Sequence, residues 1–178
     1  MKIALYLGSF NPFHNGHLKV IQQALSDFKM DKVVIVPTMQ NPWKKEKVLD
    51  IDKRFDIIIN SIFIEPIIKS LKLFSNKRLF IDLIEKELIP PYYSYSTLHA
   101  LKNKYCNDEI FILCGEDTIN DIPNWMNGEQ IIQDYNFLIC DRTKESSTEV
   151  RNRVKNNEDI YNLVNPNAIN IIKKYYKS

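Results

Sequence analysis

The chain alternates short apolar runs with longer segments in which apolar residues recur at helical spacing. Uninterrupted apolar runs predict buried strands at residues 2–8, 32–38, 109–115 and 135–141, and a weaker run predicts one at 68–74. Amphipathic spacing or capping residues predict helices over 15–28, 52–63, 95–105, from Ser146 onward and over 165–178. Strands and helices in alternation form βαβ units. The pattern therefore predicts one α/β domain over 1–178 with an open, mostly parallel sheet and helices on both faces.

Composition adds few constraints. The 178 residues suit a single domain with a sizeable core, with 44% hydrophobic and 26% charged residues. A formal net charge of +2 is too small to indicate a nucleic-acid binder, although Lys44, Lys45 and Lys47 form a local basic cluster. We therefore expect no nucleic-acid partner.

The cysteines and the N-terminus bear on the compartment. The chain has three widely spaced cysteines, Cys106, Cys114 and Cys140, and no two of them form a CxxC pair. This spacing favours reduced thiols over a disulfide framework or a zinc ribbon. The N-terminus has no signal-peptide layout, and no apolar run approaches the roughly 20 residues of a membrane span. We expect a soluble, cytoplasmic protein with no membrane partner.

The loop after the first predicted strand contains two histidines, in the stretch LGSFNPFHNGH. His14 and His17 can be metal ligands, packing residues or phosphate-binding groups. A zinc site needs further ligands, and the only other histidine is His99. A glycine turn at the carboxyl end of a strand, followed by a helix N-terminus, is typical of an anion site. The context favours phosphate, with no metal held by protein side chains.

Residues 5–21 resemble the HxGH motif of the nucleotidyltransferase superfamily. The signature GxFxPxHxGH is matched at Gly8, Phe10, Pro12, His14, Gly16 and His17. The resemblance implies a Rossmann-like fold of the nucleotidyltransferase type. It also implies transfer of a nucleotidyl group from a nucleoside triphosphate to a phosphate acceptor, with release of pyrophosphate and without a protein nucleophile.

A second stretch, ESSTEVRNR at 145–153, resembles the ISSTxxR motif of the same group. Ser146, Ser147 and Thr148 would cap a helix whose N-terminus faces the β- and γ-phosphates, and Arg151 lies one turn further on. Alone, this stretch would be an ordinary capping box on a surface helix. Together with the histidine motif, it favours triphosphate binding.

Two further stretches resemble bacterial nicotinate mononucleotide adenylyltransferases. PPYYSYSTL at 90–98 resembles their SYTxxTL, which implies acceptor binding by Ser94 and Thr97. The block beginning FILCGEDTI at 111 is similar to their GxD…W block. There, Gly115 would allow close approach, Asp117 would hold ribose hydroxyls and Trp125 would stack on a pyridine ring.

This sequence departs from that family at three places. QNPWKK at 40–45 keeps the basic Lys44 but has Trp43 in place of histidine, and LICDR keeps Arg142 but has Asp141 in place of an arginine. Only residues 143–145 separate Arg142 from Ser146. The family has a few dozen residues, including a strand, between the corresponding positions. Either the sheet lacks its usual last strand, or the strand at 135–141 leads almost directly into the phosphate-binding helix.

The resemblance thus implies adenylyl transfer from ATP to nicotinate or nicotinamide mononucleotide, with Mg²⁺ on the phosphates. It does not decide between the two mononucleotides. A homo-oligomer is possible, and the oligomeric state stays open. The expected catalytic residues are His14, His17 and Arg151. Expected ATP contacts are Gly8, Ser9, Phe10, Lys44, Gly115, Asp117, Arg142, Ser146, Ser147 and Thr148, and expected acceptor contacts are Ser94, Thr97 and Trp125. Two alternatives are a related enzyme such as phosphopantetheine adenylyltransferase and a nucleotide-binding sensor without turnover.

Overall fold

A single five-stranded sheet organises the computed structural model, which describes residues 1–40, 47–62 and 78–177. Its strands are β1 (Lys2–Gly8), β2 (Lys32–Pro37), β3 (Leu79–Ile81), β4 (Glu109–Gly115) and β5 (Asn136–Cys140). The order is β3-β2-β1-β4-β5, and every strand pair is parallel. The carboxyl ends of β1 and β4, the central strands, therefore lie at one edge, as predicted for the ligand site.

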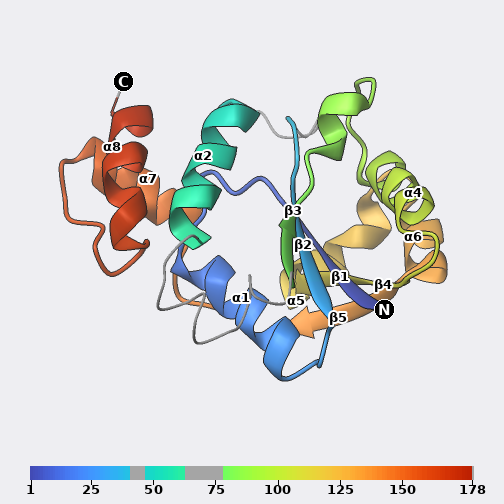
Figure 1. Cartoon of the computed structure of the whole chain (residues 1–178). Coiled ribbons are helices and arrows are strands. Elements are labelled where there is room, and N and C mark those ends of the chain that lie inside the picture. Colours follow the sequence, from blue (N-terminus) through green and yellow to red (C-terminus); the bar gives the residue numbers. More distant parts are fainter. Residues whose placement is uncertain (41–46, 63–77, 178) are drawn as a thin grey trace.

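Helices cover both faces of this sheet. They are α1 (Asn15–Ser26), α2 (Ile51–Ile62), α4 (Ser94–Lys104), α5 (Glu116–Asp121), α6 (Gly128–Asp134), α7 (Ser147–Lys155) and α8 (Ile169–Tyr176). Short 3₁₀ turns occur at Ile84–Glu87, Ile122–Asn124 and Pro166–Ala168. Figure 1 shows α2, α7 and α8 on one side of the sheet and α4 and α6 on the other. The predicted α/β architecture is confirmed.

The two faces bury separate apolar clusters. One face packs against α1, α2, α7 and α8, with Ile57 and Val150 fully buried, and the other packs against α4 and α6. Neighbouring residues of β1 divide between the clusters, since Ala4 joins the first and Leu5 the second. A strand buried on both faces requires a continuous apolar run, which explains the pattern read from the sequence.

Some elements differ from the predictions. The strand predicted at 68–74 lies outside the described residues, and β3 at Leu79–Ile81 was not predicted because three residues carry little periodicity. The helices between Glu116 and Asp134 were also missed. The connection from β5 to α7 spans only residues 141–146, and β5 is the last strand of the described sheet. In the described residues no strand follows β5, and β5 leads almost directly into α7. Both alternatives given for the short connection therefore apply.

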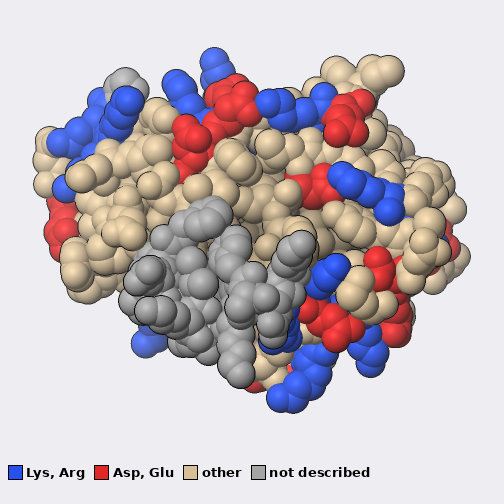
Figure 2. All heavy atoms as spheres, in the orientation of Figure 1, with Lys and Arg blue, Asp and Glu red and all other residues tan. Residues whose placement is uncertain are grey.

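The surface and the cysteines are unexceptional. On the face in Figure 2, basic and acidic side chains are interspersed with uncharged ones. Cys114 and Cys140 are buried and free, and Cys106 is exposed and free. Within the described ranges, no helix has the length and apolar character needed to cross a membrane.

Burial predicts how two isoleucines contribute to stability. Ile57 is 0% exposed in α2, whereas Ile132 is 43% exposed in α6. Ile57→Ala should lower the free energy of unfolding by about 2–5 kcal/mol, because it removes packing and leaves a cavity. Ile132→Ala should change it by less than about 1 kcal/mol. Urea unfolding of both variants measures the difference, and equal losses would contradict the described core.

Candidate active site

The loop that leaves β1 is fixed by close aromatic packing. Phe10 is 2% exposed and has a left-handed backbone with φ 44°. A Cβ at Gly8 would lie 3.0 Å from two atoms of the Phe10 ring, so glycine allows this ring to fold back over the strand end. Phe10 and Phe13 each lie 5.0 Å from the ring of His17, measured between centroids. The loop thus packs His17 against two aromatic rings.

The two histidines are coupled through the first turn of α1. The backbone N–H of His14 donates a hydrogen bond to Nδ1 of His17 at 3.0 Å, and the two rings stack at 3.7 Å between centroids. Because Nδ1 of His17 accepts, the neutral ring carries its proton on Nε2. His17 also lines a cavity described below, which makes its Nε2–H a candidate donor to a bound ligand.

Burial keeps both imidazoles uncharged in the ligand-free site. It lowers the pKa of His14 to about 4, an effect partly opposed by the carboxylate of Glu145. Burial also lowers the pKa of His17 well below its ordinary value, and the neighbouring His14 lowers it further. At neutral pH the pair therefore offers hydrogen bonds rather than fixed positive charge.

The space between His14 and the β5–α7 connection is too small for any side chain at position 16, which is glycine. A Cβ at this position would lie 2.4 Å from Oγ1 of Thr143 and 3.0 Å from the ring of His14. No side chain fits there without moving the His14 ring or the connection. This contact gives the glycine of the HxGH pattern a steric reason.

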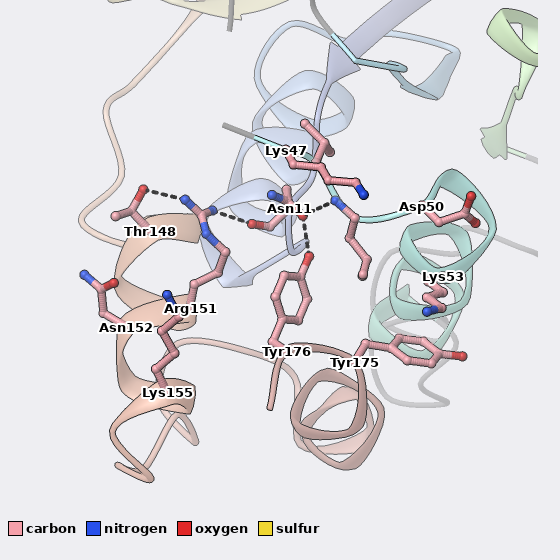
Figure 3. Close-up of a pocket in the computed structure, with 12 residues that line it drawn as sticks. Asn11, Lys47, Asp50, Lys53, Thr148, Arg151, Asn152, Lys155, Tyr175 and Tyr176 are labelled. Carbon is pink, nitrogen blue, oxygen red and sulfur yellow. Dashed lines mark hydrogen bonds between the residues drawn. The ribbon is translucent and has the colours of Figure 1, made fainter. Parts of the chain in front are cut away.

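The N-terminus of α7 docks directly on the histidine loop. Ser146 caps the helix by accepting from the N–H of Glu149 at 3.2 Å, as predicted. The hydroxyl of Ser147 donates to the carbonyl of Pro12 at 2.8 Å. Nη1 of Arg151 donates to the carbonyl of Asn11 at 2.6 Å (Figure 3). The two motifs, whose bonded residues are 135 and 140 positions apart in sequence, therefore lie together.

Asn11 and Arg54 join further parts of the chain to this loop. Its side-chain oxygen accepts from the N–H of Leu49 at 3.1 Å and from the hydroxyl of Tyr176 at 2.6 Å, shown as dashed lines in Figure 3. The 2%-exposed Arg54 donates to the carbonyls of Ser9 and Leu49, each at 2.6 Å. These residues were missed by sequence reasoning. The one available signal was Arg54, a charged residue on the apolar face of the predicted helix 52–63.

A cavity of about 310 Å³ opens at the carboxyl ends of β1 and β4. It brings together seven of the predicted site residues, Gly8, Ser9, Phe10, His17, Ser94, Trp125 and Ser147. Apolar side chains from β4 and α4 complete its wall, including Ile112 and Leu98. The indole N–H of Trp125 donates to Asp121 at 2.9 Å, which fixes the ring. The cavity has the apolar walls and few polar groups typical of a small-molecule site.

A second recess, of about 530 Å³, lies between the segment around Asn11, the start of α2, and helices α7 and α8 (Figure 3). The predicted phosphate-binding residues Thr148 and Arg151 line it, and Nη2 of Arg151 also donates to Oγ1 of Thr148 at 3.3 Å. Its cationic residues are Lys47, Lys53, Arg151 and Lys155, with Asp50 as the one acidic lining residue among those described. The recess therefore has a positive balance of charge.

Other predicted residues lie outside these two hollows. Thr97 is fully buried, and its hydroxyl donates to Glu85 at 2.6 Å, so it positions α4 rather than facing the cavity. Arg142 is exposed in a separate recess beside α1. Asp117 is exposed on α5, and a Cβ at Gly115 would meet nothing within 4 Å. His14 and Ser146 line neither hollow, and Lys44 lies outside the described residues.

The open parallel sheet, with its first loop joined to the N-terminus of a late helix, is the α/β architecture expected of a nucleotidyltransferase. Comparison with known proteins makes the assignment specific. Residues 5–171 match the family model described as cytidylyltransferase-like, and the chain belongs to this family.

Curated relatives extend over the whole chain. It is 31% identical to the probable nicotinate-nucleotide adenylyltransferase of Fusobacterium nucleatum, over 99% of both chains. It is 30% identical to the protein of the same description from Cytophaga hutchinsonii, over 100% of both. Both alignments run over 202 positions against 178 residues here, so each relative carries residues that this chain lacks.

Solved structures share the fold. A putative nicotinate-nucleotide adenylyltransferase from Vibrio parahaemolyticus superposes with a TM-score of 0.77 at 22% identity, covering 99% of this chain and 96% of that one. The nicotinic acid mononucleotide adenylyltransferase of Plasmodium falciparum, complexed with NaAD, gives 0.73 at 20% identity, covering 98% and 95%. These matches confirm the predicted nucleotidyltransferase-type architecture.

Arg54 provides a test of how the loop is held. Arg54→Met should lower the free energy of unfolding by about 3 kcal/mol, because two partly buried carbonyls lose their charged donor. Lys53→Met removes a neighbouring exposed cation and should cost less than about 1 kcal/mol. Urea unfolding compares the two variants. An Arg54→Met protein as stable as the Lys53→Met control would show that the guanidinium does not hold the loop.

Proposed function

We propose that the protein transfers the adenylyl group of ATP to nicotinate mononucleotide, forming the dinucleotide and releasing pyrophosphate. The observation that carries this proposal is the docking of α7, through Ser147 and Arg151, onto the histidine loop beside the 310 Å³ cavity. The names of the whole-length relatives support the choice of acceptor. Nicotinamide mononucleotide is the alternative acceptor that the same cavity would admit.

The acceptor is assigned to the 310 Å³ cavity. Trp125 and Ser94 lie on its wall, together with the apolar side chains of β4 and α4. An indole held by Asp121 offers a fixed aromatic face for a pyridine ring, and Ser94 offers a hydroxyl. His17 and Ser147 line the same cavity. The mononucleotide would thus place its ring against Trp125 and its phosphate toward His17.

The triphosphate is assigned to the junction of the two motifs. The turn at Gly8–Phe10 and Ser147 in the first turn of α7 line the same cavity, and a helix N-terminus favours negative charge. His14, His17 and Arg151 would supply side-chain donors. Lys44, Gly115, Asp117 and Arg142 stay predicted contacts of ATP. The cationic recess that Arg151 lines lies beside the junction and would attract the departing pyrophosphate.

The reaction needs positioning more than covalent chemistry from the protein. An oxygen of the acceptor phosphate attacks the α-phosphorus of ATP in line, a new P–O bond forms, and the bond to the bridging β-phosphate oxygen breaks. Pyrophosphate leaves with that oxygen. Aligned phosphates and fixed hydrogen-bond donors lower the barrier by pre-organisation and charge stabilisation.

Mg²⁺ would enter with ATP. Over the described ranges of the chain, no three His, Cys, Asp or Glu side chains gather in a group able to hold a metal ion. Mg²⁺ is commonly bound through substrate phosphates and water with few protein ligands, and this donor set suits that arrangement. Bound there, the ion would neutralise phosphate charge, while His17 and Arg151 orient the phosphate oxygens.

An acceptor panel tests the proposed function. Pyrophosphate release from ATP and Mg²⁺ should be fast with nicotinate mononucleotide or nicotinamide mononucleotide and near background with 4′-phosphopantetheine. The physical reason is that Trp125 and the apolar cavity wall suit a flat ring. Release with 4′-phosphopantetheine alone would favour the phosphopantetheine enzyme. ATP binding without release for any acceptor would favour a sensor.

Two substitutions of His17 distinguish the observed hydrogen bond at its Nδ1 from the proposed hydrogen bond between its Nε2–H and phosphate. His17→Ala should lower kcat by about 10²–10³-fold, since one pre-organised donor to the phosphates is lost. His17→Asn should lose comparable activity but keep more stability, because its amide oxygen can replace Nδ1 as the acceptor for the N–H of His14. Steady-state kinetics and thermal unfolding measure both effects. Near-normal turnover in either variant would exclude the assigned role of His17.

A further inference from the structure

Two buried polar atoms beside the histidine loop have no hydrogen-bond partner among the described residues. They are Nδ1 of His14 and Oε2 of Glu145. His14 is 6% exposed, and the Glu145 side chain is 11% exposed. A buried polar atom without a partner costs about 1–3 kcal/mol, so two of them at one place call for a physical reason.

The two groups influence one another electrostatically. The carboxylate of Glu145 raises the pKa of His14 against the larger effect of burial. The hydrogen bond from Lys19 is the main cause that lowers the pKa of Glu145, and His14 adds a smaller effect in the same direction. The bond of Glu145 to Lys19 joins the β5–α7 connection to α1, of which His14 is the N-cap, and a Cβ at Gly16 would meet both Thr143 of this connection and the His14 ring. An imidazole nitrogen and a carboxylate oxygen are complementary once the nitrogen carries a proton.

Lys19 holds the carboxylate and balances its charge. Its Nζ contacts Oε1 of Glu145 at 2.5 Å, which leaves Oε2 as the free oxygen. Without Lys19, a carboxylate at this place would repel a triphosphate. The pair is therefore close to neutral toward the ligand while Oε2 can still accept from His14.

Glu145 departs from the motif that this stretch resembles. The pattern that residues 145–153 resemble, ISSTxxR, has isoleucine where this sequence has Glu145. An isoleucine has no atom that can accept a hydrogen bond. The carboxylate therefore follows from this sequence rather than from the general motif.

We propose that Glu145 is a positioning residue for His14, whose Nδ1–H it accepts at Oε2 when His14 binds a phosphate oxygen through Nε2. The proposal rests on the proposed function only in placing phosphate at His14. An arriving phosphate adds negative charge and favours uptake of one proton from solvent by the ring. Both ring nitrogens then donate, one to phosphate and one to Glu145. The proton returns to solvent when the phosphate leaves.

Other charged groups surround this pair. On the two elements that meet beside His14, α1 and the β5–α7 connection, the titratable or charged residues are His17, Lys19, Gln23-bonded Asp141, Arg142, Lys144 and Glu145, of which His17 stacks on the His14 ring. Of these, only Glu145 combines a carboxylate with a free buried oxygen in the described chain. A pH response of His14 should therefore depend on Glu145 first.

The direct test follows His14 by NMR in the full chain with ¹⁵N-labelled histidine, using inorganic pyrophosphate as the probe. The chain has three histidines, so a His14→Asn sample assigns the signal. Pyrophosphate should raise the pKa of His14 in the wild type. Glu145→Gln should lower the pyrophosphate-bound pKa by about one unit, since an opposite charge is lost. Glu149→Gln, a matched change in the ion pair with Arg153, should leave it unchanged.

Lys19→Met distinguishes this role from simple structural support. If the ion pair only braced the loop, Lys19→Met and Glu145→Gln would shift His14 in the same direction. The proposal predicts opposite directions, because loss of Lys19 leaves the carboxylate less compensated and raises the pKa of His14. Shifts of the same sign, or an unchanged pKa in Glu145→Gln, would overturn it, as would a wild-type His14 that does not respond to pyrophosphate.

Turnover provides a second readout. In Glu145→Gln the alkaline limb of kcat should move about one unit to lower pH, because the protonated His14 is lost sooner, while the KM for the mononucleotide stays the same. An alkaline limb that stays in place would contradict the proposal. The pyrophosphate titration needs no acceptor. A wild type that responds as stated but does not use nicotinate mononucleotide would reject the proposed function and leave the role of Glu145 standing.

Discussion

The site depends on one constraint: the backbone carbonyls of Asn11 and Pro12 need donors, and the first turns of α7 supply them. Arg151 and Ser147 make these bonds at 2.6 and 2.8 Å. Because both donors lie on one short helix, its N-terminus has a single orientation relative to the histidine loop. The turn after β1 and the N-terminus of α7, each of a kind that favours anions, thereby lie side by side at the carboxyl edge of the sheet.

A second layer of contacts keeps that constraint in place. Asn11 is bonded to Leu49 and to Tyr176, and Arg54 holds the carbonyl of Ser9. These bonds join the loop to the start of α2 and to the end of α8. Pre-organisation of this kind matters for phosphate transfer, since donors that are already aligned need no reorganisation during the reaction. The buried histidines agree with this account, because they are uncharged without ligand and a bound phosphate would raise the pKa of His14.

The sequence predicted the parts of this structure that depend on local pattern. The four long apolar runs became strands, the glycine turn and His17 line one cavity, and Ser146 caps α7 as expected. It missed β3, which is too short for a period, and it did not indicate that the hydroxyl of Thr97 is already bonded to Glu85. It also missed Asn11 and Tyr176, 165 residues apart. Contacts between distant single residues leave no periodic signal, so only the folded chain shows them.

The most direct test of the account is the fate of labelled phosphate. The protein would be incubated with nicotinate mononucleotide, Mg²⁺ and ATP labelled at either the α- or the γ-phosphorus. The account predicts that α-label appears in the dinucleotide and that γ-label appears only in pyrophosphate. Transfer of γ-label to the mononucleotide, or release of pyrophosphate with no α-label in the dinucleotide, would contradict adenylyl transfer at the junction of the two motifs.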